Sequence, residues 1–152
     1  MATVALVAWL VTAVGGFFLL GTWVARGGPR SGTSHFPPAL IFGHFALAAI
    51  GLIIWIIYVI SDTEALAWVA FVLLLPVAAL GFVMLSRWLP VYRAERQTVA
   101  AAPAGAAGAT RAGSAERAPE QHFPVPVVIA HGLLAVTTLI LVLLTALGVG
   151  GS

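Results

Sequence analysis

Four long apolar stretches dominate this chain of 152 residues. They cover residues 3–25, 37–60, 65–86 and 124–148, and each is long enough to cross a hydrocarbon layer of roughly 30 Å as a helix. Helices are favoured there because a bilayer offers no water to an unpaired backbone. Hydrophobic residues make up 61% of the chain and charged residues only 8%, which exceeds what the core of a small soluble domain requires. The sequence therefore predicts an all-α integral membrane protein, a bundle of four transmembrane helices.

The positions of the arginines predict its orientation. All seven basic residues are arginines, and they lie between the first and second stretches or between and beside the third and fourth. The remaining loop, between the second and third stretches, has only Asp62 and Glu64. Positive residues favour the cytoplasmic side, so we expect both termini outside the plasma membrane of a bacterium. Arginines scattered around helix ends are topology signals, and they argue against binding of nucleic acid.

Two further features of composition limit the choices. Residues 98–121 are rich in alanine, glycine and proline and have no apolar periodicity, which is typical of a flexible linker. The chain has no cysteine, so disulfides, thiolate metal sites and iron–sulfur clusters are excluded. Imidazole is the strong ligand type that remains.

The chain contains an internal repeat. The segment HFPPALIFGH at 35–44 returns 87 residues later as HFPVPVVIAH at 122–131, and GFFLLGTW at 16–23 resembles GFVMLSRW, which starts 65 residues later at 81. Both units comprise two helices and therefore enter the membrane from the same side. We expect two tandem repeats, 3–60 and 65–148, related by a two-fold axis along the membrane normal within one membrane domain.

His44 and His131 are equivalent positions of this repeat. Each lies seven residues past a proline that starts a helix, about 10 Å below the cytoplasmic interface. A polar side chain at that depth costs about 2–3 kcal/mol and usually has a partner in the bundle interior. On diagonal helices, whose axes would be about 12–14 Å apart, two imidazoles are too distant for a direct hydrogen bond. A haem iron that accepts both as axial ligands fills such a gap.

Small residues occur at the same depth. Gly16 and Gly81 provide room for the edges of a haem, and Ala48 and Ala135 lie one helical turn beyond the histidines on the same face. Glycines also serve helix packing, and an intramembrane histidine can serve as a hydrogen-bonding group between helices. Both interpretations remain open at this point.

The other two histidines, His35 and His122, lie at helix starts and point away from the inner pair. One interpretation makes them interfacial residues. Another joins them to Arg26, Arg30 and Arg87 as contacts for haem propionates, where charge-assisted hydrogen bonds would be strong.

The four-helix layout with His44, His131, Gly16 and Gly81 resembles the membrane b-type cytochromes. The resemblance implies one haem b per chain, because the spans have no histidine in the half of the membrane that faces away from the cytoplasm. It also implies an electron relay without catalytic activity of its own, with a redox protein or a quinone as partner besides the lipid bilayer. The alternative is a haemless structural or assembly subunit, while a transporter is disfavoured because no span contains an acidic residue. The oligomeric state stays open.

The topology can be tested by cysteine labelling. A cysteine that replaces Asp62 would be the only one in the chain, and we expect a membrane-impermeant maleimide to label it in intact cells, because this loop lies outside. A cysteine that replaces Ser31, which directly follows Arg30 in the opposite loop, is the control and should be labelled only after lysis. The reverse pattern would invert the topology.

Overall fold

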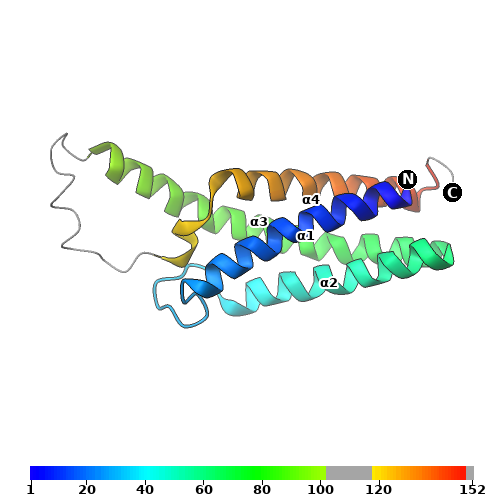
Figure 1. The fold of residues 1–152 in the computed structure, drawn as a ribbon, viewed down its shortest axis with the longest axis horizontal. Coiled ribbons are helices and arrows are strands. Elements are labelled where there is room, and N and C mark those ends of the chain that lie inside the picture. The colour runs from blue at the N-terminus through cyan, green and yellow to red at the C-terminus, as the bar shows by residue number, and fades with distance from the viewer. Residues whose placement is uncertain (102–117, 150–152) are drawn as a thin grey trace.

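The computed structural model describes residues 1–101 and 118–149 (Figure 1). These residues form four long helices and one short 3₁₀ turn. The elements are α1 (Ala2–Ala25), α2 (Pro38–Ser61), α3 (Glu64–Ala101), η1 (Pro119–His122) and α4 (Val125–Ala146). Each of the four long helices is long and apolar enough to cross a membrane. The predicted all-α, four-helix bundle is confirmed.

Prolines determine where two of the helices begin. Pro37 and Pro124 occupy the N-cap positions of α2 and α4 in extended conformations, and each helix has a further proline in its first turn. Proline is favoured there because the first backbone N–H groups of a helix have no acceptor within it. At the other end of α2, Asp62 stops the helix in the left-handed conformation with φ of 52°. Both boundaries agree closely with the predicted ones.

The third helix is longer than predicted. The sequence indicated a span over 65–86, but α3 continues through Pro90 to Ala101. The apolar stretch ends at Arg87, yet arginine, glutamate, glutamine and alanine are good helix formers, so the helix continues beyond its apolar part. The expected linker at 98–121 therefore begins with the last turn of α3 and ends in η1. Residues 102–117 of that linker lie outside the described part of the chain.

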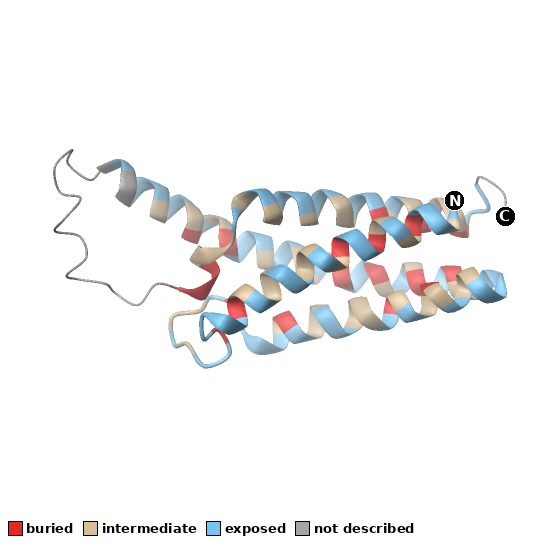
Figure 2. Cartoon of the chain, viewed as in Figure 1, coloured by how far each residue is buried: buried red, intermediate tan, exposed pale blue. Residues whose placement is uncertain are grey.

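The helices pack as a square. α2 packs against α3 and α1 packs against α4, whereas no Cα atoms of α2 and α4 approach within 8 Å of each other. α2 and α4 are therefore diagonal, as expected. Much of the outer surface of the helices is exposed (Figure 2), and it consists largely of valine, leucine, isoleucine and phenylalanine. Such a surface is compatible with surrounding lipid.

Two apolar clusters fill the interior. One is centred on Trp9 and Trp55 near the start of α1 and the end of α2. The other contains Trp23, Phe36 and Trp88 at the opposite end, where η1 and the α1–α2 loop lie. The segments of the four helices between these clusters contain His44 and His131. The core thus leaves one layer for polar groups in the middle of the bundle.

The α1–α2 loop turns tightly around the fully buried Trp23. Gly28 lies so close to this indole that a Cβ atom would overlap its ring atoms. We predict that Gly28→Ala destabilises the protein by about 1–3 kcal/mol, because overpacking forces the indole or the loop to move. Thermal unfolding in detergent measures the change. Gly32→Ala is the control, since nothing lies within 4 Å of its Cβ position, and equal melting temperatures for the two variants would contradict the prediction.

Candidate functional site

His44 of α2 and His131 of α4 meet in the middle of the bundle. Their ring centroids are 6.4 Å apart and the ring planes are inclined by 62°. Both side chains are partly buried. The structure therefore brings together the two histidines that the sequence predicted to face each other from diagonal helices.

Each of these rings is fixed by the backbone of a neighbouring helix. Nδ1 of His44 lies 3.0 Å from the carbonyl oxygen of Val77 in α3, and Nδ1 of His131 lies 3.0 Å from that of Thr12 in α1. A carbonyl oxygen can only accept a hydrogen bond, so Nδ1 donates in both contacts. In the neutral imidazole, Nε2 then has a free lone pair.

The two Nε2 atoms are accessible. Neither forms a hydrogen bond within the part of the chain that the structure describes. In the same part, no fully enclosed side-chain nitrogen or oxygen lacks a partner. Each Nε2 atom is therefore not completely enclosed. Two imidazoles that each keep an unused nitrogen lone pair could bind a metal centre.

Glycines allow the neighbouring helices to approach these rings. A Cβ atom at Gly16 would lie 3.1 Å from Cε1 of His131, and one at Gly15 would lie 3.5 Å from Nδ1 of the same ring. On the other side, a Cβ atom at Gly81 would lie 3.5 Å from Cε1 of His44. Gly16 and Gly81 thus contact the imidazoles themselves, whereas the sequence analysis assigned them to the edges of a haem. Their missing side chains bring the carbonyls of α1 and α3 within reach of Nδ1.

The alanines and a threonine pair complete this layer. Ala48 packs against the Trp9–Trp55 cluster, and Ala135 is half-buried. Thr12 also carries a hydroxyl that lies 3.4 Å from the hydroxyl of Thr138 and donates to the carbonyl of Ala8. Sequence reasoning did not single out Thr12, although a threonine one turn before Gly16 in an apolar helix was the available signal.

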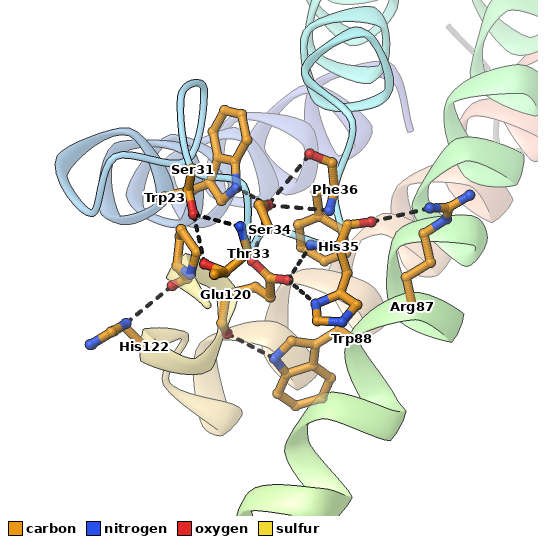
Figure 3. A network of polar contacts seen from close by, with 11 residues as sticks. Trp23, Ser31, Thr33, Ser34, His35, Phe36, Arg87, Trp88, Glu120 and His122 are labelled. Carbon is orange, nitrogen blue, oxygen red and sulfur yellow. Dashed lines mark hydrogen bonds and ion pairs between the residues drawn. The ribbon is translucent and has the colours of Figure 1, made fainter. Parts of the chain in front are cut away.

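A second polar layer lies at the end of the bundle where η1 is found (Figure 3). Its centre is Glu120, whose side chain is fully buried. Oε1 accepts hydrogen bonds from the backbone N–H of His35 at 2.6 Å and from Nδ1 of the same residue at 2.8 Å. Oε2 accepts a hydrogen bond from the Ser34 hydroxyl at 3.1 Å. This carboxylate therefore joins η1 to the α1–α2 loop.

Surrounding helices support the same layer. The indole of Trp88 in α3 donates to the backbone carbonyl of Glu120 at 3.2 Å, and that of Trp23 in α1 donates to the Ser34 hydroxyl at 3.1 Å. Arg87 donates to the backbone carbonyl of His35 at 3.1 Å. Sequence reasoning missed Glu120 because it placed this residue in a linker. The signal was an acidic side chain two residues before the repeated HFP motif.

The residues that the sequence grouped as propionate contacts have other partners in the structure, or none among the described residues. His35 binds Glu120 and Arg87 contacts the backbone of His35. Nδ1 of His122 instead lies 3.3 Å from the carbonyl oxygen of Pro119. Arg26 and Arg30 are exposed and form no ion pair with any residue in the described ranges 1–101 and 118–149. A buried carboxylate beside His35 would repel an anionic propionate.

The histidine layer offers two side chains that could act as metal ligands. Within the described residues, no three histidine, cysteine, aspartate or glutamate side chains come together in a way that could hold an ion. A haem would need only two ligands from the protein, and His44 and His131 are the residues that could hold one.

Comparisons of the chain with protein-family models, with curated proteins and with solved structures found no match. Its function is therefore inferred from its own residues and their geometry.

The contact between Gly16 and His131 gives a test of this site. We predict that Gly16→Ala destabilises the protein by about 1 kcal/mol, because the added Cβ atom would push the ring away from the Thr12 carbonyl. Gly81→Ala should have a smaller effect, since its Cβ atom would be at ordinary contact distance. Gly21→Ala, with nothing within 4 Å, is the control. Thermal unfolding measures all three, and a Gly16→Ala variant as stable as Gly21→Ala would refute this role.

Proposed function

We propose that this protein is a membrane b-type cytochrome that binds one haem b between His44 and His131 and relays electrons. The observation that supports it most directly is the pair of imidazoles on diagonal helices, whose centroids are 6.4 Å apart. The sequence places this pair in an otherwise apolar environment, where a polar side chain is energetically costly and usually has a functional partner.

The separation of the rings suits a metal that binds both. A transition-metal ion holds an imidazole nitrogen at about 2 Å, and the ring centroid lies on the order of 1 Å behind that nitrogen, so two axial histidines have centroids roughly 6 Å apart. The observed 6.4 Å agrees with this value.

The backbone hydrogen bonds at Nδ1 support ligation by Nε2. A metal-binding histidine usually donates its other ring N–H to a carboxylate or backbone carbonyl, which fixes the tautomer, orients the ring and increases its basicity. The Val77 and Thr12 carbonyls are in position to do this for His44 and His131, respectively. The chain thus provides the ligands together with the groups that orient them.

The surroundings favour electron transfer over catalysis. A haem iron with two histidine ligands has no open coordination position, and it supplies a one-electron couple. The Trp9–Trp55 and Trp23–Trp88 clusters lie on either side of the histidine layer and would keep water away from it. An independent catalytic activity is therefore not part of the proposal.

We further propose that the four helices span the plasma membrane of a bacterium, with both termini outside, and derive from two parallel two-helix repeats. Two matching pairs of contacts support the repeat. His131 contacts Thr12 and Gly16, and His44 contacts Val77 and Gly81. Val77 and Gly81 lie 65 residues after Thr12 and Gly16, respectively. The arginine-bearing end then faces the cytoplasm. A haem near that end needs a redox protein or a quinone to exchange electrons with.

One observation favours a second candidate, a haemless structural or assembly subunit. The imidazoles already contact each other edge to face and already bond the backbones of α3 and α1. Side chains that only hold helices together would make the same contacts, because hydrogen bonds between helices stabilise apolar bundles. This candidate predicts a colourless protein.

The chemical test is removal of single histidines. We predict that His44→Ala and His131→Ala each abolish the low-spin haem spectrum, because the iron loses one axial ligand. His122→Ala should retain it with at most a shifted potential, since Nδ1 of His122 faces the Pro119 carbonyl, and so should His35→Ala. Absorption spectra of the purified, reduced proteins measure the result.

Two results would contradict the proposal. A wild-type protein without a Soret band, after expression with adequate haem, would leave the structural subunit as the better explanation. Unchanged reduced spectra in all four variants would show that any bound haem uses other ligands. Circular dichroism of each variant separates loss of haem from loss of helical structure.

A further inference from the structure

The buried contact between Glu120 and His35 has no part in holding the haem. We propose that this pair is a proton-binding site whose occupancy follows the redox state of the histidine layer: His35 takes up a proton when the haem is reduced and releases it when the haem is oxidised. This inference rests on the proposed function. It proposes that the protein binds one proton for each electron that it carries.

Glu120 places a carboxyl group against His35. Its side chain is fully buried, and its two oxygens accept hydrogen bonds from a backbone N–H, an imidazole N–H and a hydroxyl. Burial limits the screening of a charge at this position by water or salt. His35 therefore lies at 2.8 Å from a carboxyl oxygen that solvent does not reach.

His35 is suited to exchange the proton. Its side chain is 57% exposed, while that of its partner is 0% exposed. The imidazole contacts Glu120 through Nδ1, and no other ring contact joins Nε2 to the described residues. Water could thus protonate Nε2 directly. The hydrogen bond between a neutral imidazole and the carboxylate of Glu120 would then become an ion pair.

No other ionisable group takes this role. From α3, Arg87 contacts only the backbone carbonyl of His35, and it remains charged throughout. From α1, the contact to this layer is the uncharged indole of Trp23. Within η1, His122 faces the Pro119 carbonyl. The carboxylate of Glu120 is the acidic group that lies against the His35 ring, at 2.8 Å.

The distance to the histidine layer permits coupling. His44 is the seventh residue of α2, about 9 Å along the helix from its first residue at 1.5 Å per residue, and His35 lies three residues before that helix. The two histidines are therefore roughly 10–20 Å apart, and the Trp23–Phe36–Trp88 cluster lies in this part of the bundle. At an effective dielectric constant of about 20, two unit charges at this distance interact strongly enough to change a proton affinity about tenfold. Reduction adds one negative charge, so the proton affinity of His35 should rise.

The balance of the step is simple. One electron enters from an external donor, such as a membrane quinol or a reduced protein, and one proton from water binds Nε2 of His35. No bond between heavy atoms forms or breaks, and the net charge of the loaded protein is unchanged. On oxidation, both leave again. If the arginine-bearing end faces the cytoplasm, the proton comes from that side.

A purely structural role makes a different prediction. As a clamp, the pair would hold η1 on the α1–α2 loop, and replacing either partner would lower the stability without changing any pH dependence of the haem potential. A readout of that pH dependence therefore distinguishes the two roles.

The experiment is a spectroscopic redox titration of the haem-loaded full-length protein in lipid nanodiscs between pH 5 and pH 9, about the range in which histidines titrate. Because proton uptake stabilises the reduced form, the midpoint potential should fall as the pH rises. The total fall should reach about 59 mV, which corresponds to the tenfold change for one electron. His35→Gln should flatten this curve, since it removes the titrating imidazole. Glu120→Gln should flatten or displace it.

Glu64→Gln is the matched control, because it neutralises an exposed glutamate at the start of α3, at the opposite end of the bundle. It should leave the pH dependence unchanged. If Glu120→Gln does not fold, His35→Gln alone decides the result.

Two outcomes would overturn the inference alone. One is a wild-type protein that binds haem with a pH-independent potential, and the other is a His35→Gln variant that keeps the full pH dependence. A protein without any haem spectrum would overturn the proposed function and this inference together, and it would be recognised before any titration. Melting temperatures of the variants report separately on the clamp.

Discussion

The hydrogen bonds from His44 and His131 to backbone carbonyls of neighbouring helices fix how this bundle is assembled. Most other contacts between its helices are apolar, and apolar side chains tolerate small shifts of one helix along another. A directional bond at 3.0 Å does not. These bonds determine the register of α2 against α3 and of α4 against α1. A small residue is favoured at the contact, most strictly at Gly16, where a Cβ atom would lie 3.1 Å from Cε1 of His131.

The histidine layer depends on what lies on either side of it. Toward the chain termini, Trp9 and Trp55 fill the space between the helices, and toward η1 the indoles of Trp23 and Trp88 do the same. The latter two use their N–H groups to bind Ser34 and the backbone of Glu120. An indole can cover apolar surface and satisfy a polar partner at once. The aromatic residues thus separate the histidine layer from the carboxylate layer while connecting each to the surrounding helices.

Simple sequence patterns predicted where most of the helices lie. The positions at which these predictions were wrong have physical explanations. Apolar length located the four helices, and prolines located the starts of α2 and α4. The end of α3 was missed because hydropathy reports where a helix leaves an apolar environment, whereas helix propensity decides where it stops. Glu120 was missed because its segment resembles a linker in composition. Its importance comes from burial, which a local pattern of alanine, glycine and proline does not reveal.

Hydropathy and the spacing of a repeat are local properties, so they were enough to predict the four apolar helices and to single out His44 and His131. The atoms that these histidines contact could be identified only once the helices were packed together. Nδ1 of each ring meets a carbonyl from a helix far away in the chain, and Gly16 and Gly81 lie against imidazoles rather than in open space. The tertiary structure likewise paired Glu120 with His35, across 85 positions of sequence. Such contacts depend on how helices pack in three dimensions, and the packing of distant segments is not encoded in any one of them.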